Sequence, residues 1–275
     1  MKPAPFEYIR ADSVLQALEW LAADPEARLI AGGQTLMPML AMRLVRPTRV
    51  IDIAGIPGLD RLEIGASHIT LGAMLRQVAV ERSAELAAAL PLLAKAIRFV
   101  GHPPTRRRGT IGGSVANADP AAEIALVAVT LGAEVLLAGA DAMPARDFFL
   151  APMTTALPPG AMVTGLRFPR STAARRGTGF AEVAMRQGDY AMAAAACEIL
   201  ADADGRCVGL RLGIGGATPV PVLLDVTAPE RAAVAAALAP LEMLHDPNAG
   251  AGYRRRAALA LAMQALDEAK AEAGI

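Results

Sequence analysis

The sequence has few cysteines, few aromatic residues and no excess of charge, and each shortage excludes a class of protein. Cys197 and Cys207 are the only cysteines in 275 residues, too few for a disulfide framework or for an iron–sulfur cluster, which normally takes four thiolates. Aromatic residues make up 4% of the chain and hydrophobic residues 54%, so the core must be aliphatic. The 27 basic residues balance the 27 acidic ones, which argues against a nucleic-acid partner.

The sequence also lacks long apolar runs and metal-ligand patterns. The longest apolar candidate, residues 124–140, is interrupted by Glu134, so no membrane span of about 20 residues is expected. The first residues, Met-Lys-Pro-Ala-Pro-Phe-Glu, have no apolar core of a signal peptide, and we expect a cytoplasmic protein. The three histidines have no metal-ligand spacing. We therefore expect no metal site, and no residue is predicted to be catalytic.

Two glycine pairs flanked by hydroxyl side chains are the most informative feature. The first is Ala31-Gly32-Gly33-Gln34-Thr35, between an apolar run and a plausible helix start at Leu36. The second is Thr110-Ile111-Gly112-Gly113-Ser114. Glycine permits positive φ and close approach of another group, and successive N–H groups can then form an anion-binding concavity. The pattern predicts two loops that clamp two linked phosphates, although a single Gly-Gly pair is most often an ordinary turn.

With Asn117-Ala118-Asp119-Pro120-Ala121-Ala122-Glu123, these motifs resemble the FAD-binding medium subunit of the molybdenum hydroxylases. The resemblance covers nearly the whole chain, from about Phe6 to about Leu266. It implies an α+β fold with a two-subdomain FAD-binding domain of the PCMH/vanillyl-alcohol-oxidase type over residues 1–170. The subdomains would span about 1–55 and 56–170, and a C-terminal flavoprotein domain would span 177–275.

Local patterns predict the elements of these domains. Ser13 and Gln16 form a capping box before a helix, and Asp204-Gly205 is typical of a hairpin turn. Small residues over 171–177 indicate a linker, and a three-stranded antiparallel sheet is expected after it. Strands are predicted over 6–9, 28–31 (buried), 49–53, 62–66, 68–72, 134–137, 162–168, 179–183, 191–201 and 207–214. Helices are predicted over 14–23, 36–40, 74–82, 86–99, 119–131, 229–238 and 253–273.

The resemblance implies FAD as the cofactor and assigns its contacts to several segments. The backbone of residues 32–35 would supply N–H donors, and Leu36 and Met37 an apolar wall. An aromatic side chain such as Tyr190 can stack on or edge the flavin ring. The full set of implied contacts is Ile30, Ala31, Gly32, Gly33, Gln34, Thr35, Leu36, Met37, Thr110, Ile111, Gly112, Gly113, Ser114, Asp119, Glu123, Val163 and Tyr190.

Several of these residues have a second, purely structural interpretation. Asp119 and Glu123 are four residues apart on the predicted helix and hence on one face, but Asp119 is also a favoured helix cap and Glu123 a plausible solvated surface acid. Tyr190 could pack into the seam between the domains. Arg106, Arg107 and Arg108 are more typical of a solvated or partner-contacting face than of a group that steers the anionic cofactor.

The resemblance implies an electron-transfer function. A large partner subunit would hold the molybdenum cofactor, and a small partner would carry two [2Fe–2S] clusters, in a heterotrimer or a dimer of heterotrimers. FAD would accept electrons from the clusters and pass them to an external acceptor. Two alternatives remain open. One is a free-standing FAD-dependent oxidoreductase acting on its own small substrate, for which His102 is the candidate base near the second glycine pair. The other is a non-catalytic assembly subunit whose glycine pairs are only turns.

Overall fold

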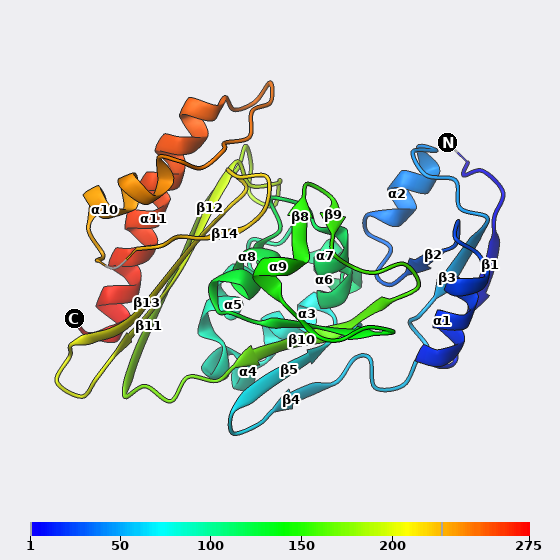
Figure 1. The fold of residues 1–275 in the computed structure, drawn as a ribbon, viewed down its shortest axis with the longest axis horizontal. Coiled ribbons are helices and arrows are strands. Elements are labelled where there is room, and N and C mark those ends of the chain that lie inside the picture. The colour runs from blue at the N-terminus through cyan, green and yellow to red at the C-terminus, as the bar shows by residue number, and fades with distance from the viewer. Residues whose placement is uncertain (1, 227) are drawn as a thin grey trace.

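The computed structural model describes residues 2–226 and 228–275. Their strands form sheets of three, five and four strands and a small two-stranded hairpin. The three larger sheets follow one another along the long axis of the molecule, with the N-terminal unit at one end and the C-terminal sheet at the other (Figure 1).

The N-terminal unit is a small parallel sheet with two helices. Its strands run in the order β1-β3-β2, all parallel. Ser13 caps α1 by accepting a hydrogen bond from the Gln16 N–H. The Gln16 side-chain oxygen accepts in turn from the Asp12 N–H and not from the Ser13 N–H. The prediction of a buried strand at β2 is wrong, because β2 is an edge strand and is partly exposed. The elements are β1 (Glu7–Arg10), α1 (Val14–Ala23), β2 (Arg28–Ile30), α2 (Leu36–Ala41) and β3 (Arg49–Asp52).

The central unit is a five-stranded sheet with short helices around it. The strand order is β4-β5-β10-β6-β7, and the strands predicted over 62–66 and 68–72 are present as the antiparallel pair β4 and β5. Its strands are β4 (Leu62–Ile64), β5 (His68–Gly72), β6 (Glu134–Ala138), β7 (Met143–Pro144) and β10 (Met162–Pro169), with the hairpin β8 (Phe149–Ala151) and β9 (Thr154–Thr155) beside them. Its helices are α3 (Gln77–Arg82), α4 (Ala84–Ala89), α5 (Pro91–Ala96), α6 (Pro103–Arg108), α7 (Ile111–Asn117), α8 (Glu123–Thr130) and α9 (Ala145–Phe148).

Proline explains two of the helix boundaries that the sequence prediction missed. The single helix predicted over 86–99 is divided, because Pro91 begins the new helix α5 at its first turn. Pro103 likewise begins α6, where only a break was expected. The helix predicted from 74 starts at Gln77, and the helix predicted from 119 starts at Glu123.

The C-terminal unit confirms the predicted antiparallel meander and adds a short fourth strand. The order is β11-β12-β13-β14, and Gly205, with φ of 82°, lies in the turn between β12 and β13. The fourth strand was missed because it has only two residues. The elements are β11 (Arg175–Val183), β12 (Ala193–Ala201), β13 (Cys207–Gly215), β14 (Val222–Leu223), α10 (Arg231–Leu238) and α11 (Ala251–Ala273).

Small residues allow the long helix α11 to lie directly on this sheet. A Cβ atom at Gly177 or Gly179 would lie only 1.8 or 1.9 Å from the carbonyl oxygen of Ala269 or Ala265. Helices α5 and α8 cover the opposite face of the same sheet (Figure 1). The alanines at 193–196 in the central strand β12 are consequently buried on both faces, which explains a strand whose composition would suit a helix.

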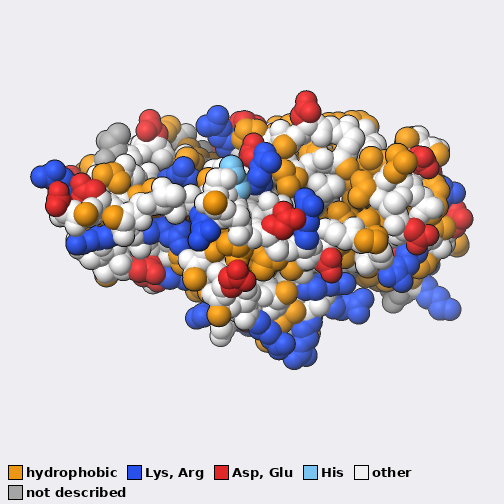
Figure 2. Space-filling model, turned by 90° about the horizontal axis from the view of Figure 1, so that it is seen from below, with side chains coloured by type: hydrophobic (Ala, Val, Ile, Leu, Met, Phe, Trp, Pro, Cys, Tyr) orange, Lys and Arg blue, Asp and Glu red, His pale blue; other side chains and the backbone are white. Residues whose placement is uncertain are grey.

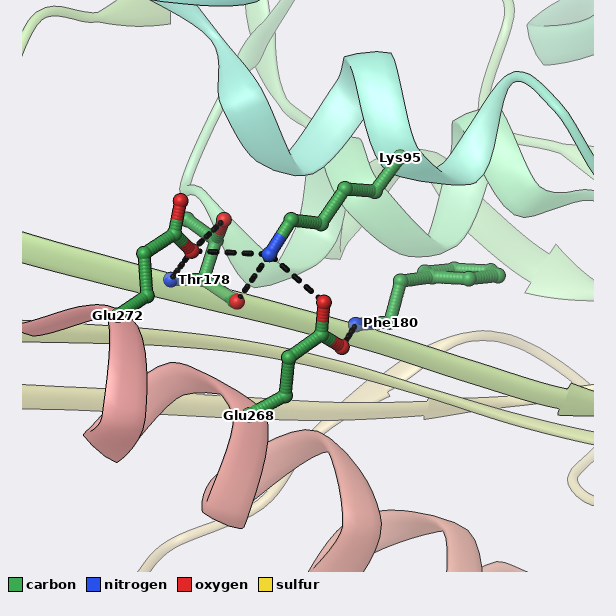
Figure 3. A network of polar contacts seen from close by, with 5 residues as sticks. All are labelled: Lys95, Thr178, Phe180, Glu268 and Glu272. Carbon is green, nitrogen blue, oxygen red and sulfur yellow. Dashed lines mark hydrogen bonds and ion pairs between the residues drawn. The ribbon is translucent and has the colours of Figure 1, made fainter.

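A charged network joins the central unit to the C-terminal unit (Figure 3). The Lys95 ammonium group, on α5, donates to Glu268 and Glu272 of α11 at 2.8 Å each and to the Thr178 carbonyl of β11 at 2.6 Å. Burial lowers the pKa of Lys95, but the two carboxylates outweigh it and the net pKa is raised. The network therefore fixes α5, β11 and α11 relative to one another.

The surface carries both signs of charge. On the face seen in Figure 2, basic and acidic side chains are intermingled with hydrophobic ones. Within residues 2–226 and 228–275, no helix has the length and apolar character needed to cross a membrane.

Candidate functional site

A cavity of about 690 Å³ lies between the N-terminal and central units. Helices α6 and α7 are the part of the central unit that faces the N-terminal unit (Figure 1). The cavity collects most of the predicted contact residues from segments that are far apart in the sequence. Those that line it are Ala31, Gly32, Gly33, Gln34, Thr35, Leu36, Thr110, Gly112, Gly113, Ser114, Asp119, Glu123, Val163 and Tyr190.

Three predicted contacts, Ile30, Met37 and Ile111, do not line the cavity. Ile111 is fully buried in the central core. Ile30 and Met37 lie beside the first glycine pair, since a Cβ at Gly33 would be 3.3 Å from Ile30 Cδ1 and 3.2 Å from Met37 Cγ.

The first glycine segment presents unused hydrogen-bond donors to the cavity. Gly33 has φ of 70°, a left-handed conformation that glycine adopts at little cost. In the described part of the chain, the backbone N–H groups of residues 32–35 donate to no acceptor. Thr35 precedes α2 but makes no side-chain cap bond. Successive free N–H groups around a left-handed residue form a concavity that suits an anion.

The second glycine segment is the first turn of helix α7 and not a loop. The N–H groups of Ile111 and Gly112 donate to the carbonyls of Leu75 and Ala73 at 3.0 and 2.9 Å. Those of Gly113 and Ser114 donate to the hydroxyl and the carbonyl of Thr110. The backbone N–H groups of this second segment are therefore already used within the chain, and the predicted clamp of two phosphates by both segments stays a prediction.

Close packing explains why glycine stands in the second segment. A Cβ at Gly112 would lie 2.4 Å from the Cβ and 2.7 Å from the Cα of Ala73. Helix α7 thus rests directly on the chain that follows β5. This contact positions Thr110 and Ser114, whose side chains are the polar groups of the segment, in the cavity wall.

The two glycine segments meet at Gly32. A Cβ there would lie 2.3 Å from the carbonyl oxygen of Arg108, at the end of α6. The Arg76 guanidinium donates to the same carbonyl. The missing side chain at Gly32 therefore lets the first segment approach the chain that leads into α7.

Carboxyl groups lie beyond the second segment. Asp119 precedes α8 and accepts a hydrogen bond from the Ala121 N–H at 2.9 Å, so it caps a turn, while Ala122 is the N-cap of the helix. Glu123 is buried, which rules out a solvated surface acid. Burial raises the pKa of Glu123 to about 7, and the charge of Asp119 acts in the same direction. Burial, together with the charge of Glu123, raises the pKa of Glu182 on β11 to about 8.

Val163 and Tyr190 complete the predicted set. Val163 lies on β10 and is buried at the cavity wall. Tyr190 lines the cavity but is 73% exposed. The alternative of a tyrosine packed into the domain seam is therefore wrong, and its ring is available at the rim.

Arg106 has a structural role that the sequence interpretation missed. Its side chain is buried and makes two bonds to the Glu81 carboxylate, at 2.8 and 2.9 Å. It also donates to the carbonyls of Val100 and Gly101. The expectation of a solvated or partner-contacting arginine is wrong at this position, because Arg106 anchors α6.

Some cavity residues were not predicted as FAD contacts. Gln77, His102, Asn117 and Asp189 line the cavity, and none of them was assigned an FAD contact. Gln77 is the clearest case, since it is the first residue of α3 and lies more than 30 residues before the second motif. Nothing in its local sequence indicates a ligand. Its burial and missing hydrogen-bond partner become visible only in three dimensions.

Comparisons with known proteins agree with this geometry. Residues 4–171 match the family model described as the FAD binding domain in molybdopterin dehydrogenase. The chain is 36% identical to the nicotine 6-hydroxylase medium subunit of Paenarthrobacter nicotinovorans, over 92% of this chain and 93% of that protein. It is 31% identical to the carbon monoxide dehydrogenase medium chain of Afipia carboxidovorans, over 99% of each.

A solved structure extends the similarity to the fold. The chain aligns with quinoline 2-oxidoreductase from Pseudomonas putida 86 with a TM-score of 0.92 and 30% identity, covering 100% of both chains. The predicted α+β FAD-binding fold is thereby confirmed. The cofactor that the family model names, FAD, fits a cavity with free backbone donors on one side and apolar residues in its walls.

Proposed function

The chain belongs to the family of FAD-binding medium subunits of molybdenum hydroxylases, and on this premise we propose that it relays electrons from a partner subunit to an external acceptor. In this proposal FAD receives electrons from [2Fe–2S] clusters on a small subunit and passes them to an external acceptor. A large subunit with the molybdenum cofactor oxidises the substrate.

The observation that carries the proposal is the cavity between the N-terminal and central units, whose described lining combines free backbone donors with apolar wall. The free N–H groups of residues 32–35 are suited to the pyrophosphate of FAD. Val163 and Leu36 supply apolar wall, and Tyr190 supplies an aromatic ring at the rim. When bound, FAD supplies the redox chemistry, and the chain's residues bind, orient and shield it.

Partner subunits are proposed from the relatives. The names "medium subunit" and "medium chain" belong to proteins that match over at least 92% of this chain. By analogy, this chain would assemble with one large and one small subunit, as a heterotrimer or a dimer of heterotrimers. The partners would hold the molybdenum cofactor and the clusters.

A single-turnover experiment tests the relay without knowledge of the substrate. The small subunit is reduced with dithionite, freed of excess reductant and mixed anaerobically with the oxidised, FAD-loaded chain, while flavin absorbance is followed. The proposal predicts rapid bleaching of the flavin. Flavin that stays oxidised in the presence of the reduced partner would contradict the relay.

The same preparation separates the two alternatives. Acid release of the cofactor should give free FAD, and a chain that takes up no FAD even with its partners would be an assembly subunit. His102 lines the cavity, and this position favours the alternative of a free-standing oxidoreductase. Flavin that remains attached to the denatured chain would favour that alternative.

A further inference from the structure

Gln77 is a buried polar residue in the cavity wall to which no role has been assigned. It begins α3, and its backbone N–H donates to the Gly109 carbonyl at 3.0 Å. Its side chain is only 5% exposed, yet it lines the cavity. The residue therefore lies inside the wall, next to the chain that leads into α7.

The amide of Gln77 has no partner within the described chain. Its Oε1 atom is buried and accepts no hydrogen bond. The large majority of buried side-chain polar atoms in proteins are hydrogen-bonded, so an unpaired one needs an explanation. A cavity for a polar cofactor supplies one, because the cofactor can bring the missing donor.

The surrounding backbone leaves room for this amide. A Cβ at Gly109 would lie 2.3 Å from Gln77 Oε1, so any larger residue there would displace the amide. Gly109 directly follows Arg108, whose carbonyl is approached by Gly32. The amide thus lies where the two glycine segments converge, with its oxygen buried against Gly109. Rotation about its soft terminal torsion would turn the oxygen toward the cavity.

We propose that Gln77 is a further FAD-binding residue, whose side-chain amide accepts a hydrogen bond from a sugar hydroxyl of the cofactor. An unpaired acceptor requires a donor, and the phosphate oxygens of FAD accept hydrogen bonds instead of donating them. The ribityl chain and the ribose both carry hydroxyl groups. The proposal rests on the FAD site proposed above and is independent of the electron relay.

The test is a titration of the full-length, flavin-free chain with FAD, followed by the quenching of flavin fluorescence. Gln77→Met keeps the length of the side chain and removes the amide, and Gln77→Leu repeats the change with another apolar shape. Both variants should bind FAD at least about tenfold more weakly, the effect of one lost hydrogen bond. Gln264→Leu, which removes an exposed amide on α11, should bind like the wild type.

Thermal unfolding of the same flavin-free variants separates binding from folding. Removing an unpaired buried amide should leave the Tm of the flavin-free chain unchanged or raise it. Wild-type FAD affinity in both Gln77 variants, or a weakening that only parallels a lower Tm, would overturn the proposal. A wild-type chain that binds no FAD would overturn it together with the proposed function.

Shorter ligands identify which hydroxyl is bound. Riboflavin carries the ribityl chain alone, and ADP carries the ribose alone. If Gln77→Met weakens riboflavin and leaves ADP unchanged, the ribityl chain is the partner, and the opposite result assigns the ribose. If Gln77→Met binds FAD, riboflavin and ADP each as tightly as the wild type does, the hydrogen bond is again rejected.

Discussion

The two glycine pairs look alike in the sequence and do different work in the fold. At Gly32-Gly33 the chain turns through a left-handed residue and leaves the N–H groups of residues 32–35 without acceptors. At Gly112-Gly113 the chain is helical, and the N–H groups of residues 111–114 are all bonded within the protein. One pair offers donors to a ligand, whereas the other allows a helix to approach its neighbour.

The difference shows that a glycine pattern does not by itself specify a phosphate site. What decides is whether other parts of the chain already use the N–H groups. The N–H groups of Ile111 and Gly112 donate to the carbonyls of Leu75 and Ala73, whereas no acceptor within residues 2–226 and 228–275 takes the N–H groups of residues 32–35. The two segments should therefore respond differently to substitution.

The largest effect is expected on stability at the second segment. Gly112→Ala forces a Cβ to within 2.4 Å of Ala73, and overpacking of this kind should lower the free energy of unfolding by about 3 kcal/mol. Urea denaturation of the flavin-free chain measures it. Gly113→Ala is the matched comparison, since its Cβ would meet the Thr110 hydroxyl at 2.8 Å and the Ala31 Cβ at 3.7 Å but no backbone atom outside its own helix within 4 Å among the described residues, and it should cost less. If both substitutions lower the free energy of unfolding equally, close packing of Gly112 on Ala73 is not the cause.

Substitution in the first segment should weaken FAD binding more than it lowers the stability of the flavin-free chain. Gly33→Val places a β-branched residue at φ of 70°, which distorts the free donors and should weaken FAD binding at least about tenfold. Gly58→Val is the control, because Gly58 has φ of 80°, a Cβ there would have no described atom beyond its chain neighbours within 4 Å, and Gly58 does not line the cavity. The two variants should unfold at similar temperatures without flavin. Full flavin content in Gly33→Val would take the first segment out of the site.

Charge is a second difference between the two regions, and it predicts a pH dependence. Asp119 and Glu123 follow the second segment and line the cavity, and the charge of Glu123 acts on Glu182. The pKa of Glu182 is raised from 4.5 to about 8, so its protonated form favours the folded state. The stability it contributes is present below pH 4.5 and is lost as pH rises through about 8.

Glu182→Gln should accordingly flatten the decline in Tm of the flavin-free chain between about pH 5 and 8. Glu26→Gln, at an exposed position, should leave that decline unchanged. If Glu182→Gln and the wild type lose Tm equally over this range, the carboxyl group is not buried in the way the fold indicates.

The smallest expected effect is on the free energy of unfolding, at the two threonines that precede α7 and α2. Thr110 caps α7 by accepting from the Gly113 N–H at 3.1 Å, so Thr110→Val should lower the free energy of unfolding by about 1 kcal/mol. Thr35 makes no cap bond, and Thr35→Val should leave that free energy unchanged. Chemical denaturation of both flavin-free variants decides the point, and an equal loss at Thr35 would show that it caps α2 after all.

The fold was largely predictable where local patterns were strong. The capping box at Ser13, the hairpins and the meander of β11–β13 follow from cap, turn and alternation signals. Boundaries failed at Pro91 and Pro103, because a proline that ends one helix can also begin the next. The site was recognised by its motifs, but three facts needed long-range contacts: the bonded N–H groups of α7, the burial of Arg106 and the unpaired amide of Gln77. The domain limits stay a prediction.

Residue-resolved hydrogen exchange with and without FAD tests the central contrast most directly. The account predicts that the N–H groups of residues 32–35 exchange quickly in the flavin-free chain and become protected when FAD binds. Those of residues 111–114, already hydrogen-bonded, should be protected in both states. If FAD instead protects residues 111–114 and leaves 32–35 in fast exchange, the second segment holds the cofactor's phosphates, and the account is contradicted.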